Sequence, residues 1–269
     1  MLGVHHDGMI FNAIHPTSNI QHPTSNIQHS TFNIQHSIFD IRYSIFTPML
    51  VYLTRHGQTI SNADDRVAGS LDVDLSDAGR TQAERLASAV SHFTFDAVFT
   101  SQLDRTIQTV RPLLRRSGTP HVSLSELNEI NLGCLEGRFR DERDPEAAAM
   151  WAQRQAALAT FRPPGGESFS DLQKRVRRAL ATIRYIAAQG VILIVGHRNV
   201  NRALLSELLA MPLVDALEFR PRANRLVKLT DNFTQSTSPL VEVFKITDHG
   251  KLQLDNKSGR LLHECRSLG

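Results

Sequence analysis

Two histidines, two arginines and one glutamate follow short apolar runs of this 269-residue chain. They are Arg55 and His56 after MLVYLT, Arg105 after AVFT, Glu129 after HVSL and His197 after VILIV. Guanidinium groups pair with phosphate oxygens, an imidazole can attack phosphorus, and a carboxyl group can supply or remove a proton. Without further acidic ligands the same set makes a poor metal site. The residue types therefore indicate binding and transfer of a phosphoryl group, with no metal.

The apolar runs and the helical spacing between them predict alternating strands and helices. Strands are expected over residues 49–54, 97–100, 121–124 and 191–195. Helices are expected over residues 76–90, 103–115, 141–160, 170–188 and 200–209, with Ser76 as an N-cap and with Ser170 and Gln173 as a capping box. This order is typical of an α/β three-layer sandwich, with a mainly parallel central sheet and helices on both faces. The carboxyl ends of parallel strands share one edge, so the five residues are expected to converge there.

Six ordered segments resemble the histidine phosphatase superfamily, which includes cofactor-dependent phosphoglycerate mutases and small-metabolite phosphatases. The resemblance covers most of residues 49–211. The segments are LTRHGQTISN at 53–62, LSDAGRTQAERLA at 75–87, TSQLDRTIQT at 100–109, LNEINLGCLEG at 127–137, PGGES at 164–168 and VGHRNVNRALL at 195–205. A single RHG triplet would be weak, whereas six motifs in the family's order are specific. The resemblance implies a phosphoglycerate mutase-like fold and the phosphatase branch of the family.

The resemblance also implies a catalytic role for each of the five residues. His56 is expected to attack phosphorus in line and become a phosphohistidine, with its other ring nitrogen held by a backbone carbonyl. Arg55, Arg105 and His197 are expected to surround the phosphoryl oxygens and stabilise the charge of the transition state. Glu129 is expected to protonate the leaving group and then, as a carboxylate, to activate water. Neither a metal ion nor another cofactor is implied.

Four more positions are predicted to bind the substrate or its phosphate. Asn62 and Gly69 align with family positions that contact phosphate or shape the loop around it, and Asn199 aligns with a further contact. Arg198 departs from the small residue that is common after the second histidine. Its guanidinium could favour a second anionic group on the substrate, or it could point to solvent. Cys134 is a second departure, at the variable position of its motif.

Several alternatives stay open. Glu126 and Glu136 are rivals for the acid role, because a loop could bring either of them near. The leading function is hydrolysis of a small phosphorylated metabolite, and the alternatives are mutase-type phosphoryl transfer and a catalytically silent binding module. The modest span between the acid and the second histidine argues against a mutase. Selectivity is expected to lie in a cap over residues 141–164 and in the tail beyond Pro212, neither of which has a readable motif.

Composition narrows the partners and the location. Thirty Lys and Arg against 27 Asp and Glu leave a net charge of +3, which requires neither a nucleic-acid nor a membrane partner. Two distant cysteines form no disulfide or metal pattern and fit a reducing cytoplasm. No run approaches the roughly 18 apolar residues of a membrane span. The tail runs LVKL and VEVFKI could complete the sheet edge or pair with another subunit, which leaves a homodimer open.

Residues 1–48 contain a degenerating heptapeptide repeat. Its units are HPTSNIQ, HPTSNIQ, HSTFNIQ, HSIFDIR and YSIF, which begin at His15, His22, His29, His36 and Tyr43. Prolines within the first two units and too few apolar residues argue against a coiled coil. The histidines recur because the whole unit recurs, which argues against a dedicated metal site. We expect a low-complexity extension that is disordered or not native, followed by a catalytic domain over residues 49–269.

Overall fold

A seven-stranded mixed sheet organises the part of the chain that the structure describes. The computed structural model describes residues 49–231 and 241–256, so the predicted extension at 1–48 lies outside the described residues. The strand order is β3-β2-β4-β1-β5-β6-β7. The parallel strands are β1 (Met49–Arg55), β2 (Ala97–Thr100), β3 (His121–Ser123) and β4 (Val191–Gly196). The antiparallel strands are β5 (Arg225–Asp231), β6 (Val241–Ile246) and β7 (Leu252–Leu254). The predicted α/β class with a mainly parallel core is confirmed, and the tail completes one edge of the sheet.

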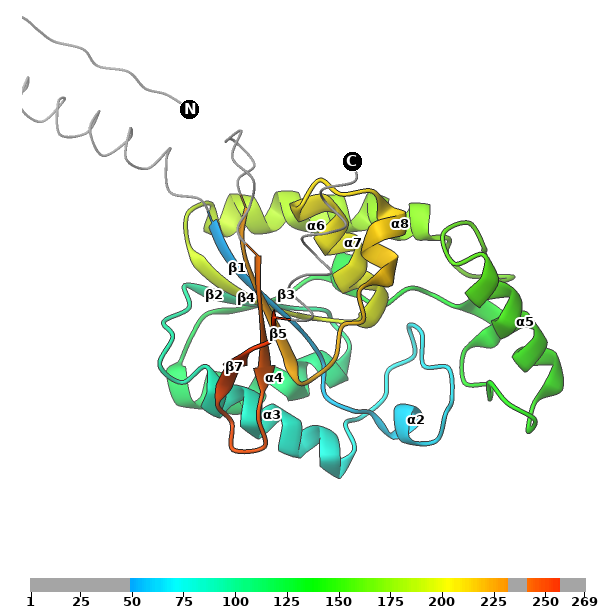
Figure 1. Cartoon of the computed structure of the whole chain (residues 1–269), viewed down its shortest axis with the longest axis horizontal. Helices are drawn as coiled ribbons and strands as arrows, with labels where there is room; N and C mark the ends of the chain where they lie inside the picture. Colours follow the sequence, from blue (N-terminus) through cyan, green and yellow to red (C-terminus); the bar gives the residue numbers. More distant parts are fainter. Residues whose placement is uncertain (1–48, 232–240, 257–269) are drawn as a thin grey trace, which may run out of the picture. The chain divides into compact units, whose positions relative to one another are not determined.

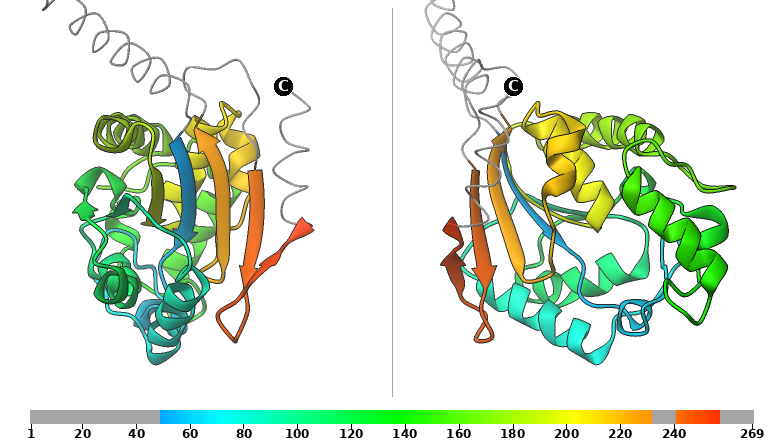
Figure 2. Two further views of the ribbon diagram at one scale, coloured as in Figure 1. Left: turned by 90° about the vertical axis from the view of Figure 1, so that its left-hand side faces the viewer. Right: turned by 45° about the vertical axis from the view of Figure 1, so that its right-hand side comes forward.

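Helices cover both faces of this sheet, as predicted (Figure 2). One face carries α3 (Asp77–Ala89) and α4 (Asp104–Ser117). The other carries α6 (Phe169–Ala187), α7 (Arg198–Leu208) and the short α8 (Leu213–Glu218). No helix in the described ranges is long and apolar enough to cross a membrane.

The strand β4 contributes to the core on both of its faces. Ile192 and Ile194 pack in the cluster that contains α6 and α7, whereas Leu193 and Val195 pack in the cluster that contains α3 and α4. Successive side chains of a strand point to opposite faces, so a strand buried on both faces is apolar throughout. This explains why VILIV is the most hydrophobic strand of the sequence.

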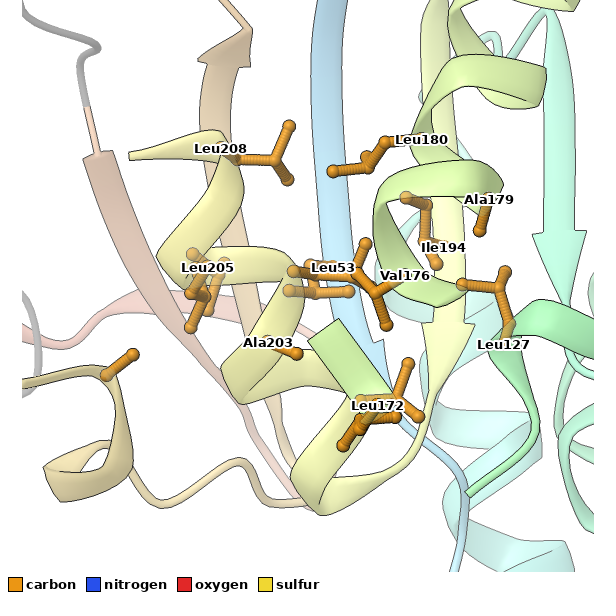
Figure 3. Packing of buried hydrophobic residues seen from close by; sticks show 14 of the residues in the cluster. Leu53, Leu127, Leu172, Val176, Ala179, Leu180, Ile194, Ala203, Leu205 and Leu208 are labelled. Atoms are coloured by element: carbon orange, nitrogen blue, oxygen red, sulfur yellow. The ribbon is translucent and has the colours of Figure 1, made fainter. Parts of the chain in front are cut away.

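The α6 and α7 side of the core is formed by branched aliphatic side chains. Leu53 of β1 and Ile194 of β4 lie against Val176 and Leu180 of α6 and Leu205 of α7 (Figure 3). Each of these side chains is at most 1% exposed. Burial of one such side chain stabilises the fold by about 1.5–3 kcal/mol, so this face fixes the sheet to its helices.

Four further elements occur in the described ranges. They are α2 (Ile60–Ala63), the 3-10 turns at Ser125–Leu127 and Gly133–Leu135, and α5 (Pro145–Ala156). Figure 1 shows α5 apart from the helical layers, on the side of the sheet to which β1 leads. The predicted helix over 141–160 is shorter than expected, because α5 covers only Pro145–Ala156. The predicted role of residues 141–164 as a cap that sets selectivity stays a prediction.

The predicted capping box of the long helix is wrong. The N-cap of α6 is Ser168, whose hydroxyl accepts from the Asp171 backbone N–H at 3.3 Å. The Asp171 carboxylate in turn accepts from the Ser168 backbone N–H at 2.9 Å. Ser170 lies exposed inside the first turn, while Phe169 is fully buried. Both serines fit the local pattern, and burial of Phe169 selects the earlier start.

We expect Ser168→Ala to lower the free energy of unfolding by about 1 kcal/mol, because it removes the N-cap acceptor of α6. Chemical denaturation of the full chain measures this change. The matched control is Ser170→Ala, which should be neutral or slightly stabilising because alanine has the higher helix propensity. Equal losses in the two variants would contradict the observed cap.

Candidate active site

The parallel pairing of β1 with β4 brings the two predicted catalytic histidines together. Arg55, the last residue of β1, lies opposite Gly196, the last residue of β4. The next residue on each strand is a histidine, and the His56 backbone N–H donates to the Gly196 carbonyl at 3.0 Å. The His56 and His197 rings lie with centroids 5.0 Å apart and planes inclined by 58°. The register of one strand pair therefore sets the separation of the two imidazoles.

His56 is held as a neutral imidazole, and only one of its ring nitrogens has a hydrogen-bond partner among the described residues. Its Nδ1 lies 2.6 Å from the carbonyl oxygen of Gly57, which can only accept, so Nδ1 carries the proton and Nε2 carries the lone pair. The ring is 5% exposed. Burial lowers the pKa of His56 well below its usual value, and the nearby Arg55 and Arg105 lower it further. The ring is thus neutral at neutral pH, as a nucleophile must be.

A close backbone contact fixes the loop that carries His56. A Cβ at Gly57 would lie 2.7 Å from the carbonyl oxygen of Gly79 in the first turn of α3, so no larger residue fits. The Gly57 backbone N–H donates to the Thr109 hydroxyl at 2.9 Å, and that hydroxyl donates to the Arg105 carbonyl at 2.6 Å. The residue after His56 is therefore tied to both α3 and α4, which limits movement of the imidazole.

Arg105 is positioned by carbonyl groups that leave its charge unneutralised. Its Nη1 donates to the Leu71 carbonyl at 2.6 Å and its Nη2 to the Gly69 carbonyl at 2.7 Å. Gly69 has φ +53°, and a Cβ there would lie 2.2 Å from a carboxylate oxygen of Glu136. Burial lowers the pKa of Arg105 from its usual range. Gly69 thus shapes the loop whose carbonyl orients the guanidinium, consistent with one of its two predicted roles.

His197 is fully buried and both of its ring nitrogens have protein partners. The Nε of Arg105 donates to Nδ1 at 3.2 Å, so Nε2 carries the proton and donates to the Ser101 hydroxyl at 2.8 Å. Burial lowers the pKa of His197 well below its usual value, with Arg105 and His56 adding to the effect. His197 contacts the His56 ring rather than lining the pocket described next. Its predicted contact with a phosphoryl group stays a prediction.

One pocket of about 80 Å³ collects the other predicted residues. Its lining includes Arg55, His56, Asn62, Gly69, Arg105, Glu129, Arg198 and Asn199. Asn62 accepts from Arg55 Nη2 at 3.3 Å, and it completes a capping box with Thr59 at the start of α2. Burial lowers the pKa of Arg55 to about 10, with Arg198 as the next cause. Arg198, for which two orientations were open, lines the pocket.

The pocket geometry favours Glu129 among the three candidate acids. Its carboxylate is 9% exposed and accepts from the backbone N–H groups of Ile130 at 2.9 Å and Asn199 at 3.2 Å. The Glu136 carboxylate instead accepts from the Ser70 backbone and hydroxyl and from the Leu132 backbone, which fixes the loop near Gly69. Glu126 lines none of the pockets around His56. Glu129 alone combines burial with a place beside His56.

Sequence reasoning missed four arginines and one tryptophan next to this pocket. Arg154 and Trp151 come from α5, Arg202 from α7, and Arg220 and Arg222 from the segment before β5. No sequence motif marks Arg154 and Trp151 in the cap, and none marks Arg220 and Arg222 in the tail. The spacing of Arg198 and Arg202 by four residues on one helix was a usable signal, because such residues share a face.

The described residues contain no group of three or more His, Cys, Asp or Glu side chains that could hold a metal ion. The carboxylates near His56 are outnumbered by guanidinium groups, which repel cations. The donor set is therefore suited to an anion.

The fold is an α/β sandwich, and two buried neutral histidines and several arginines lie at the carboxyl edge of its parallel strands. This combination defines a class of phosphate-handling proteins. The profile described as "Histidine phosphatase superfamily (branch 1)" matches residues 51–236. The chain belongs to this superfamily, as the sequence analysis predicted.

Individual relatives carry different names. A Yersinia pestis protein named "Probable phosphoglycerate mutase GpmB" is 35% identical over 162 residues, which cover 60% of this chain and 75% of that protein. The crystal structure of the alpha-ribazole phosphatase from Shigella flexneri aligns with a TM-score of 0.65 and 26% identity, over 77% of this chain and all of that one. A mycobacterial glucosyl-3-phosphoglycerate phosphatase aligns with a TM-score of 0.61 and 27% identity, over 77% and 97% of the two chains. The names of the two structural relatives support phosphatase activity in general and differ in substrate.

We expect the free energy of unfolding to fall as the pH falls from about 6.5 toward 5. Burial lowers the folded-state pKa of both His56 and His197, so in this range the unfolded chain binds more protons than the folded one. The stability that each buried neutral histidine contributes is fully present above the pKa that it has in the unfolded chain. This contribution is lost progressively as the pH falls below that pKa. Each such histidine contributes a slope of up to about 1.4 kcal/mol per pH unit. Chemical denaturation at a series of pH values measures the slope.

In the same pH series, the free energy of unfolding of His197→Gln should show a smaller slope than that of the parent protein, because glutamine does not titrate. The control is His92→Gln, which changes an exposed histidine on the surface and should keep the slope of the parent protein. A slope that His197→Gln leaves unaltered would contradict neutral burial of His197.

Proposed function

We propose that this protein hydrolyses a small phosphorylated metabolite through a phosphohistidine on His56, without a metal ion. The observation that carries the proposal is the contact of His56 Nδ1 with the Gly57 carbonyl at 2.6 Å, which leaves the Nε2 lone pair for attack. Arg55 and Arg105 in the same pocket supply positive charge where negative charge develops. The superfamily membership and the phosphatase names of the structural relatives support the reaction class.

The reaction proceeds in two half-reactions. His56 Nε2 forms a bond to phosphorus while the ester P–O bond breaks, and the Glu129 carboxylic acid gives its proton to the departing alkoxide. Water then attacks the phosphohistidine, the N–P bond breaks, and the Glu129 carboxylate takes the proton of the water. Free phosphate and the alcohol leave, and both residues return to their starting states. One carboxyl group can serve both steps because it ends the first in the form that the second requires.

Phosphoryl transfer by a mutase is the second candidate, and the name of the Yersinia pestis relative favours it. A mutase must retain the phosphoryl group until a second hydroxyl of the substrate accepts it, which requires exclusion of water. A silent binding module is less well supported, because every member of the predicted catalytic set lies in or beside one pocket. Four further expectations stay predictions. They are a cytoplasmic location, the lack of a nucleic-acid partner, a homodimer and a dispensable extension at 1–48.

His56→Ala should lower phosphate release from a panel of phosphomonoesters by at least roughly 10³-fold, because the nucleophile is lost. The assay uses the full chain with chelator present and follows both free phosphate and isomerised substrate. Mass spectrometry of rapidly quenched protein should find phosphate on the peptide that contains His56. The control is His92→Ala, which removes an exposed histidine and should act like the parent protein. Activity that chelator abolishes, or that His56→Ala retains, would reject the mechanism, and isomerised substrate in place of free phosphate would favour the mutase.

Glu129→Gln should lower kcat/KM by about 10²–10⁴-fold for an alkyl phosphate, whose alkoxide leaving group needs a proton. The loss should be much smaller for 4-nitrophenyl phosphate, because nitrophenolate leaves without one. Glu126→Gln makes the same change on the same segment and should alter neither substrate's rate appreciably. Equal losses for the two substrates would assign Glu129 a positioning role instead of proton donation.

A further inference from the structure

We propose that the arginine-lined cavity next to the His56 pocket binds a second phosphate group of the substrate, so that small bisphosphorylated molecules are the preferred class. This inference rests on the proposed function, because the first phosphate group is the one that reacts at His56. The cavity has a volume of about 450 Å³ and lies between α5, α7 and the segment that precedes β5. Its lining contains Arg55, Arg154, Arg198, Arg202, Arg220 and Arg222, and it contains no aspartate or glutamate.

The cavity is continuous with the candidate active site. Arg55, Arg198 and Asn199 line both this cavity and the pocket that holds His56 and Glu129. A molecule that places one phosphate beside His56 therefore reaches the arginine-lined cavity across Arg198. Trp151 also lines both spaces and offers an apolar wall to the carbon skeleton between two phosphates. The arrangement fits one small molecule with two anionic ends.

Arg154 is the residue that points most directly to an anionic ligand. Its side chain is 3% exposed, and its buried Nη2 has no hydrogen-bond partner among the described residues. Its Cζ lies 5.3 Å from the centroid of the Trp151 ring, which offers partial compensation for the charge. A buried and unpaired guanidinium group is destabilising unless a counter-charge is supplied. A phosphate oxygen in the cavity would supply it.

Arg202 adds a second buried cation to the same wall. It is 8% exposed, and its Nε donates to the Phe219 carbonyl at 2.8 Å, which orients the group without neutralising it. Burial lowers the pKa of Arg202 to about 10, and repulsion from Arg198 is the next cause. The buried arginines therefore repel one another, and a bound anion relieves that repulsion.

The charge of the cavity favours a phosphate over a carboxylate. Glu129 is the only acidic residue among the described residues that line this cavity and the pocket around His56. A carboxylate brings one negative charge, whereas a phosphate monoester brings about 1.5 to 2 and three acceptor oxygens. Guanidinium groups bind such oxygens in pairs of parallel hydrogen bonds. Several arginines around one space are therefore better matched by a second phosphate.

Binding to a chain that cannot turn over tests this directly. Isothermal titration calorimetry of full-length His56→Ala protein compares fructose 1,6-bisphosphate, fructose 6-phosphate and 3-phosphoglycerate. The bisphosphate should bind at least about tenfold more tightly than the monophosphate, with the phosphoglycerate between them. Equal affinity for the bisphosphate and the monophosphate would overturn the proposal. A phosphoglycerate that binds as tightly as the bisphosphate would overturn its choice of phosphate over carboxylate.

Variants in the same background assign the preference to the cavity. Arg154→Gln should reduce the bisphosphate preference about tenfold, since it removes a buried charge-assisted donor. The double variant Arg220→Gln/Arg222→Gln changes exposed residues of the cavity and should also reduce the preference, which keeps the test valid if Arg154→Gln fails to fold. Arg115→Gln, an exposed arginine of α4 outside the cavity, is the matched control and should preserve it. An undiminished preference in both the folded Arg154 variant and the double variant would overturn the assignment.

Turnover by the parent protein separates this inference from the proposed function. The parent protein could release no phosphate from any substrate while binding still favours the bisphosphate. That result would reject the proposed function and support the second phosphate site. Phosphate release that depends on His56 together with no bisphosphate preference would support the proposed function and reject the second site.

Discussion

The parallel pairing of β1 with β4 is the contact on which the candidate site depends. Arg55 and Gly196 lie opposite each other at the ends of these strands, so His56 and His197 follow at one height on the same edge. Because both strands are buried on both faces by α3, α4, α6 and α7, their register is strongly specified. A slip by one residue would turn Ile192 and Ile194 toward the wrong helices. The packing of an apolar core thereby fixes the distance between two polar rings.

Desolvation of cations is the second constraint, and the fold meets it with carbonyl groups. Arg105 donates to the carbonyls of Gly69 and Leu71, and Arg202 donates to that of Phe219. A carbonyl oxygen satisfies a donor without cancelling its charge, so the site keeps a positive potential in a region of reduced dielectric. Burial lowers the pKa of His56 and His197, and the nearby positive charges lower it further, so both rings stay neutral. One electrostatic arrangement therefore attracts anions and preserves an imidazole lone pair.

The glycines of the motifs acquire a physical meaning in this setting. Gly57 and Gly79 belong to two separate sequence motifs, yet a Cβ at Gly57 would meet the Gly79 carbonyl and a Cβ at Gly79 would meet the Gln58 carbonyl. Gly69 adopts a left-handed φ of +53° next to the carboxylate of Glu136, which holds this loop by accepting from the Ser70 backbone N–H. Spacing could not separate Glu129 from Glu136, because the hydrogen bonds that distinguish them, from Asn199 and from Ser70, join residues more than sixty positions apart.

The sequence by itself determined the alternation of strands and helices, the edge at which Arg55, His56, Arg105 and His197 meet, and the superfamily. Apolar periodicity and motif order carry that information locally. Only the tertiary structure decided that α6 starts after Ser168, since burial of Phe169 distinguishes two serines with similar local patterns. Only the tertiary structure showed that Arg154 of α5 and Arg202 of α7 line one cavity. The position of α5 depends on contacts that are spread over many residues, so no local pattern predicts it. Local patterns predict which elements form, whereas long-range packing decides which charges share a cavity.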